Sequence, residues 1–163
     1  MSELNPYDKF LNGRPLEEIL HETTNRIAFL LAKIGVDRSV VRPSPEKWSA
    51  AEIVAHLADC ELVFAFRLRQ TLAEDAPTIQ PFDQDKWAAC YGGIGAGEAL
   101  GVFGSLRRWN LTLIGKAMPG AADRTVTHPE RGTMTFLTLV ETMAGHDLNH
   151  LAQLEKISAT PGE

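Results

Sequence analysis

Two histidines in the C-terminal part of the chain, His146 and His150, have the spacing that most directly suggests chemistry. Side chains four residues apart in a helix lie one turn apart on the same face. The neighbouring apolar residues keep this period, so the imidazoles interrupt a row that otherwise consists of Leu139, Met143, Leu154 and Ile157. The sequence therefore predicts that both imidazoles point into the core, close enough to reach one common atom.

A third histidine, His56, has the same kind of position in an earlier segment, between Ile53 and Cys60 on the apolar face. Neutral imidazole nitrogens are good ligands for borderline divalent ions, and three of them leave coordination positions open for water or substrate. We therefore expect His56, His146 and His150 to bind one divalent transition metal, with zinc or nickel as the favoured ions.

Each of these residues also has a simpler interpretation. An inward histidine is usually a core residue that hydrogen-bonds to its neighbours. The metal hypothesis depends on the joint pattern, because three imidazoles without a common partner inside a core would be costly. Cys60, one turn after His56, could supply a fourth ligand or a thiolate, although a small buried residue is the simpler interpretation.

Three polar residues beside the histidines are weaker candidates. Asp59 and Asp147 are the candidate catalytic residues, because either carboxylate could orient an imidazole N–H or act as a general base. The alternative is that both are solvated carboxylates on helix surfaces. Gln153 lies one turn after His150 and could hydrogen-bond to a bound water or substrate, or simply be polar at the edge of this face.

Composition restricts the class of protein. The 163 residues are 44% hydrophobic and 23% charged, which predicts one globular domain over residues 1–163. The formal charge of −5 argues against a nucleic-acid groove or a polybasic membrane surface. Two cysteines are too few for a disulfide framework. Because no signal-like segment is seen and no apolar run approaches the roughly 20 residues of a membrane helix, we expect a cytoplasmic location.

Four segments show helical periodicity, and no segment convincingly alternates as a strand. The best-defined start is a capping box, in which the side chains of Ser49 and Glu52 each accept a hydrogen bond from the other residue's backbone N–H. A polar loop is expected over 121–132 and one or two helical turns over 82–91. The pattern predicts an all-α four-helix bundle, with helices over about 15–34, 49–73, 97–118 and 133–158.

The positions of the histidines predict the order of the helices. His56 lies near the start of the second helix and His150 near the end of the fourth, so they share a level only if those helices are antiparallel. Parallel helices would separate them by roughly 9–15 Å. The connection of about 22 residues between the second and third helices is long enough to cross the bundle. We therefore expect an up-down-down-up topology.

This topology would bring the later part of the crossover to the metal site. Trp87 and Tyr91 are the candidate substrate-binding walls, with ordinary packing as the alternative. His128 is expected near the far end of the bundle, roughly 20 Å from His146 along the axis. His21 is expected to be solvated, and Arg67, about 16 Å from His56 along the axis, is not assigned to the metal.

Three stretches of the chain, residues 5–13, 48–59 and 145–153, carry motifs of a known family: Asn5-Pro6-Tyr7, Phe10-Leu11-Asn12-Gly13, Trp48-Ser49, Glu52-Ile53, His56-Leu57-Ala58-Asp59 and Gly145-His146-Asp147-Leu148-Asn149-His150-Leu151 with Gln153. In these motifs the chain resembles the DinB-like superfamily, which includes YfiT-type metal-dependent proteins and thiol-dependent transferases. The resemblance implies a bundle with a long crossover, a metal bound by the three histidines, and a homodimer.

The residues and the resemblance together favour a metal-dependent enzyme that acts on a small-molecule substrate. The ion would activate a low-molecular-weight thiol for transfer to a small electrophile. A metal-dependent hydrolase of a small substrate is the alternative, and a non-catalytic dimeric metal-binding bundle is the second alternative.

Overall fold

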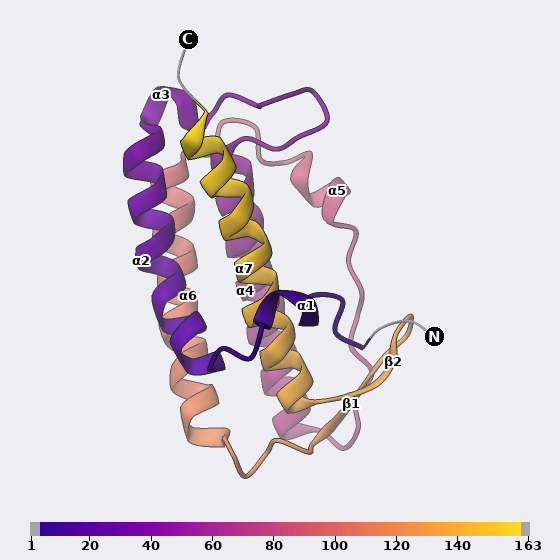
Figure 1. Ribbon diagram of the computed structural model, residues 1–163. Coiled ribbons are helices and arrows are strands. Elements are labelled where there is room, and N and C mark those ends of the chain that lie inside the picture. The colour runs from indigo at the N-terminus through magenta and orange to yellow at the C-terminus, as the bar shows by residue number, and fades with distance from the viewer. Residues whose placement is uncertain (1–3, 161–163) are drawn as a thin grey trace.

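The computed structural model describes residues 4–160 and is mostly helical (Figure 1). Its four long helices begin and end within three residues of the predicted bounds: α2 (Leu16–Ile34), α4 (Ala50–Ala73), α6 (Ala96–Ala117) and α7 (Phe136–Ala159). Three short helices accompany them in the described residues: α1 (Asp8–Leu11), α3 (Val36–Ser39) and α5 (Gln84–Ala88). The predicted domain of residues 1–163 includes two termini, 1–3 and 161–163, that lie outside the described residues.

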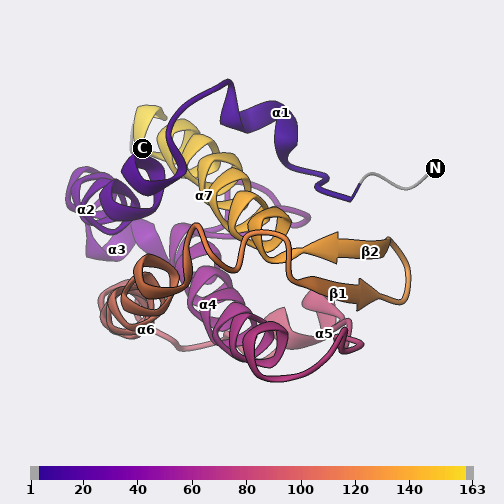
Figure 2. The ribbon, with the colours of Figure 1, turned by 90° about the horizontal axis from the view of Figure 1, so that it is seen from below.

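The long helices form a bundle in the predicted up-down-down-up order. In Figure 1, α2 and α7 run upward, whereas α4 and α6 run downward. Residues 74–95 form the long crossover that joins the lower end of α4 to the upper end of α6. The view along the bundle in Figure 2 shows the four helices around a common core, with α4 beside α6 and α2 beside α7. Helices α4 and α7, which carry the histidines, are therefore antiparallel neighbours.

Local capping fixes where the two histidine-bearing helices begin. Ser49 Oγ accepts a hydrogen bond from the backbone N–H of Glu52 at 3.2 Å, and a Glu52 carboxylate oxygen accepts one from the backbone N–H of Ser49 at 2.8 Å. Helix α7 begins similarly, since Thr135 Oγ1 accepts a hydrogen bond from the backbone N–H of Thr138. Each cap satisfies an N–H that has no partner inside its helix.

The prediction of a polar loop over 121–132 is wrong in part, because a β-hairpin forms there. Strands β1 (Thr125–His128) and β2 (Gly132–Thr135) pair antiparallel, and the start of α7 therefore moves from the predicted residue 133 to Phe136. Val126 and Met134 are register partners and both are buried. Strands of only four residues contain too few alternations to be recognised by their period.

The crossover is attached to this hairpin. The backbone N–H of Ile79 donates to the Thr127 carbonyl at 2.9 Å, and the N–H of Thr127 donates to the Pro77 carbonyl at 2.8 Å. Figure 2 shows the hairpin projecting from one side of the bundle, where it covers the flank that α4 and α7 share. Among the described residues, no helix is both long enough and apolar enough to span a bilayer.

Candidate metal centre

His56 from α4 and His146 and His150 from α7 meet inside the bundle. The Nε2 atoms of His56 and His146 are 3.1 Å apart, as are those of His146 and His150. One ligand nitrogen from each of the three rings lies within 4.8 Å of the other two. Nitrogens about 2.0–2.1 Å from a common zinc ion would be about 3 Å apart if their bonds met at right angles. The cluster therefore fits a divalent ion bound by three imidazoles.

The electrostatic surroundings keep all three rings neutral. Burial, together with the neighbouring His150, lowers the pKa of His56 to about 3. Burial lowers the pKa of His150 to about 4, although its contact with Gln153 acts in the opposite direction. Burial, the two other histidines and Arg107 hold the pKa of His146 well below its usual value. Metal ligation requires unprotonated imidazole, so the rings are prepared to bind an ion at neutral pH.

Gln153 contacts the outer nitrogen of one ligand. Its Oε1 lies 3.2 Å from His150 Nδ1. When this nitrogen donates to the amide oxygen, the Nε2 lone pair faces the other two histidines, which is the tautomer that a metal requires. The structure therefore places Gln153 beside the cluster, where it orients an imidazole.

Aromatic rings enclose the cluster. The Trp48 ring is nearly parallel to that of His150, with centroids 6.4 Å apart, and its centroid lies 4.8 Å from that of His56. The Tyr7 ring meets His146 edge-on at 5.1 Å. Gly145 permits this approach, because a Cβ at that position would lie 2.6 Å from the Tyr7 carbonyl oxygen. Tyr7 and Trp48 together therefore contact all three imidazoles.

Two hollows reach the histidines. An open groove of about 600 Å³ has His150, Trp48 and Gln153 in its wall, and it also includes Gln84 and Asp85 from the crossover. A smaller cavity of about 260 Å³ has His56, Cys60 and His146 in its wall. Both hollows include Tyr7.

Cys60 lies at the edge of the cluster. Its Sγ atom is 3.5 Å from His56 Nε2 and 3.9 Å from His146 Nε2. The side chain is 7% exposed. Burial and the nearby carboxylates of Asp59 and Glu61 raise the pKa of its thiol.

The two candidate catalytic aspartates are both engaged by other groups. Asp59 Oδ2 accepts a hydrogen bond from the Tyr91 hydroxyl at 2.8 Å. Burial and this carboxylate raise the pKa of Tyr91, and Tyr91 itself is 4% exposed within the core. Asp147 is 2% exposed and pairs with Arg107. Within residues 4–160, neither carboxylate hydrogen-bonds to a histidine ring, and Tyr91 is buried in the core.

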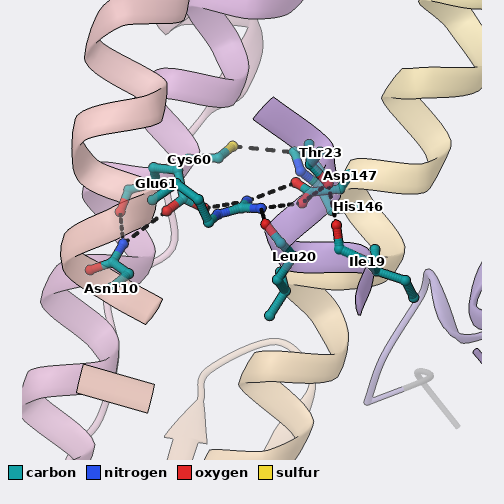
Figure 3. Close-up of polar contacts among 9 residues, drawn as sticks. Ile19, Leu20, Thr23, Cys60, Glu61, Asn110, His146 and Asp147 are labelled. Atoms are coloured by element: carbon teal, nitrogen blue, oxygen red, sulfur yellow. Dashed lines mark hydrogen bonds and ion pairs between the residues drawn. The ribbon is translucent and has the colours of Figure 1, made fainter. Parts of the chain in front are cut away.

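Arg107 pairs with Glu61 and Asp147 in a buried charged network, and Figure 3 shows Glu61, Asn110, Thr23 and Asp147 of this network. Its guanidinium donates to both carboxylate oxygens of Asp147 at 2.6 and 3.0 Å and to Glu61 at 2.6 Å. Thr23 Oγ1 donates to Asp147, and Asn110 Nδ2 donates to Glu61. The network therefore ties all four long helices together at the level of the histidines.

The crossover contributes different residues to the groove from those predicted. Trp87 packs against Phe82, with ring centroids 4.7 Å apart, and lines a separate surface hollow beside Leu62 and Phe66. Gln84 and Asp85, one turn earlier in α5, line the groove at His150. That Trp87 and Tyr91 bind a substrate stays a prediction.

Three further residues at the site were not assigned to it from the sequence. Arg67 and His128 line the smaller cavity together with His56, and Tyr7 contacts His146. The expectation that His128 lies near the far end of the bundle is wrong, because the hairpin carries it back along α7. His21 is exposed, as predicted.

The sequence model of the DinB superfamily matches residues 19–154. The chain belongs to the DinB superfamily. The matched range contains all three histidines, His56, His146 and His150.

Relatives in this superfamily have names that refer to metals. A protein from Oceanobacillus iheyensis named "Putative metal-dependent hydrolase" is 27% identical over 111 residues, which are 68% of this chain and 64% of the relative. A protein of the same description from Geobacillus kaustophilus is 31% identical over 121 residues, which are 71% and 66% of the two chains. This chain therefore spans slightly less than two thirds of each relative's length.

A solved structure supports the fold. YfiT from Bacillus subtilis, described as "a probable metal-dependent hydrolase with an unusual four-helix bundle topology", aligns with a TM-score of 0.81 at 18% identity. The alignment covers 88% of this chain and 83% of YfiT. The up-down-down-up bundle is thus shared with a protein of known structure.

Proposed function

We propose that this chain is a metal-dependent enzyme in which His56, His146 and His150 hold one divalent ion, zinc or nickel. The observation that supports this most strongly is the convergence of three buried, neutral imidazoles, in which His146 Nε2 lies 3.1 Å from the Nε2 atoms of both His56 and His150, and His150 also lines an open groove. A site that served only to stabilise the fold would be expected to be closed. The groove of about 600 Å³ has the size of a small-molecule pocket.

Hydrolysis of a small substrate is the reaction that we place first. A divalent ion held by three imidazoles lowers the pKa of a coordinated water or thiol and thereby supplies a nucleophile near neutral pH. Asp85 lines the groove together with His150, and we take its carboxylate as the candidate acceptor of the proton. The names of the relatives from Oceanobacillus iheyensis and Geobacillus kaustophilus favour hydrolysis, which reverses the order expected from the resemblance.

Transfer of a low-molecular-weight thiol to an electrophile remains the second candidate. The observation that favours it is that the two candidate bases are already engaged, Asp59 by the Tyr91 hydroxyl and Asp147 by Arg107. A thiol has an ordinary pKa near 8.5 and therefore needs less help than water to lose its proton. Thiol transfer would thus depend less on a carboxylate in the groove.

The test is to load the chain with zinc or nickel and assay two panels: esters and amides alone, and electrophiles with an added thiol. His150→Ala should abolish turnover in either panel, whereas His21→Ala, an exposed control, should retain it. Asp85→Asn should slow hydrolysis much more than thiol transfer. Turnover that persists in the chelated chain and in His150→Ala would contradict the proposal.

We also propose a homodimer that works on its small substrate in the cytoplasm. The outer sides of α4 and α6 expose Leu62, Phe66 and Trp109, which are 54%, 63% and 61% accessible, and such apolar surface favours association. Cys60 and Cys90 are free thiols, as in a reducing compartment. Light scattering of the wild type and of Phe66→Lys measures the oligomeric state.

A further inference from the structure

Arg67 carries a buried charge for which the structure shows no partner carboxylate. The side chain is 9% exposed. Its Nη2 donates to the backbone carbonyl of Gln80 at 2.6 Å, and its guanidinium lies 6.0 Å from the centre of the Phe82 ring. Within residues 4–160, Arg67 belongs to none of the ion pairs. A buried charge without an opposite charge is costly, so a position of this kind is expected to serve a ligand.

The cavity in front of Arg67 ends on the metal ligands. His56 and His146 form one part of its wall, and Arg67, His128 and Arg131 form another. The volume of about 260 Å³ accommodates a small organic molecule or part of a larger one. A ligand in this cavity can therefore reach the guanidinium of Arg67 and the histidine cluster at the same time.

The groups near Arg67 in this cavity are mainly basic. His128 is 5% exposed, and its Nδ1 accepts a hydrogen bond from the backbone N–H of Glu130, so the neutral ring has its proton on Nε2 and can donate it. After burial, the charges of Arg131 and Arg67 are the main influences that lower the pKa of His128. Both arginines therefore act on the space that His128 faces, with Glu130 as the opposing charge.

We propose that this cavity binds an oxyanion, a carboxylate or a phosphate, carried by the substrate, with Arg67 as the principal ligand and His128 and Arg131 beside it. Guanidinium groups bind such oxyanions through two parallel N–H donors. The anionic end would lie at Arg67, and the reactive end would lie toward His56 and His146. The placement of the reactive end rests on the proposed function. Anion binding at Arg67 does not, because it requires no metal.

The experiment measures the binding of three probes by calorimetry: inorganic phosphate, acetate and the uncharged acetamide. Each is titrated into the metal-free and the zinc-loaded chain. We expect phosphate and acetate to bind both forms, and acetamide to bind neither. Arg67→Gln should weaken anion binding at least about tenfold in the metal-free chain, and Arg67→Lys should restore part of the loss. Arg108→Gln, an exposed arginine on α6, is the matched control and should bind like the wild type.

The outcomes separate this inference from the proposed function. Equal phosphate affinity in the wild type and in Arg67→Gln would overturn the inference, as would binding of acetamide as tight as that of acetate. The same is true if Arg67→Gln only lowers stability in urea and leaves anion affinity unchanged, because Arg67 would then serve only to anchor the crossover. A chain that binds phosphate through Arg67 but takes up no zinc or nickel would contradict the metal-dependent function and leave the anion site intact.

Discussion

Two buried polar regions lie beside consecutive residues of α7, Asp147 and His146, and differ in how their groups are satisfied. On the side of Asp147, each carboxylate accepts several hydrogen bonds, and Arg107, Thr23 and Asn110 supply the donors. On the side of His146, three neutral rings direct nitrogen atoms at one another. The region at Asp147 contains both the carboxylates and the guanidinium that pairs with them. The histidine region has too few N–H donors for the nitrogen lone pairs that meet there.

This difference separates a structural role from a binding role. Buried charges that are paired and hydrogen-bonded need no ligand, although they are weak as a source of stability. Neutral imidazoles whose nitrogen lone pairs face one another lack N–H donors for all of these lone pairs. A metal cation can accept the lone pairs instead. The network at Arg107 therefore positions α7, and the histidine cluster is the site that requires something from outside the chain.

Acidification should have the largest effect, and it should act mainly on the histidine side. The unfolded chain protonates its histidines near pH 6.5, whereas the folded metal-free chain resists protonation of His56 down to about pH 3 and of His150 down to about pH 4. The unfolded state then binds more protons, so stability is present above pH 6.5 and is lost as the pH falls toward 4. Urea unfolding at a series of pH values measures this, and a metal-free chain equally stable at pH 7 and pH 4.5 would contradict it.

Removal of Arg107 tests the charged side. Arg107→Met leaves Glu61 and Asp147 buried without their cation, and we expect a loss of about 3–5 kcal/mol in the free energy of unfolding. Arg108→Met, an exposed neighbour, should change stability by less than about 0.5 kcal/mol. Urea denaturation of both variants decides the matter. If Arg107→Met were as stable as the wild type, the network would not hold the helices together.

Zinc should stabilise the folded chain through the histidine side. At a free zinc concentration about 1,000 times the dissociation constant, the expected gain is about 4 kcal/mol. His56→Ala should lose this gain, because only two imidazoles remain, while His21→Ala should keep it. Thermal unfolding with and without zinc gives the result. A gain of the same size in His56→Ala would show that zinc binds elsewhere.

The contact between Tyr7 and α7 should give the smallest of these effects. Gly145→Ala places a Cβ 2.6 Å from the Tyr7 carbonyl oxygen, so the N-terminal segment must shift at a cost of about 1–3 kcal/mol. Gly101→Ala on α6 is the control, because its Cβ would meet nothing within 4 Å and alanine is the better helix former. Unfolding in urea should therefore show opposite signs for the two substitutions.

Sequence reasoning could predict the parts of the site that repeat with a helical period. His146 and His150 share one face of α7 because of their spacing, and the depth of His56 in α4 was enough to predict the antiparallel arrangement and the long crossover. These relations follow from the rise and turn of a single helix, which the sequence specifies locally.

Contacts that depend on irregular segments could not be predicted in this way. Asp147 was a candidate catalytic residue, with a solvated helix surface as the alternative, and nothing in its own helix indicates that Arg107, 40 residues earlier, meets it in the core. His128 returns to the site because a hairpin of two four-residue strands pairs with the crossover. Such pairings are set by tertiary packing, for which a short alternation of residues gives little signal.

The central claim is that three imidazoles hold one ion, and zinc-edge X-ray absorption of the zinc-loaded chain, with the metal content measured on the same sample, tests it most directly. The structure predicts one zinc per chain with three imidazole nitrogens at about 2.0–2.1 Å from the ion. The spectrum of His150→Ala should show fewer imidazole ligands than that of the wild type. A wild-type chain that retains no zinc after loading, or a spectrum without imidazole ligands, would contradict the claim.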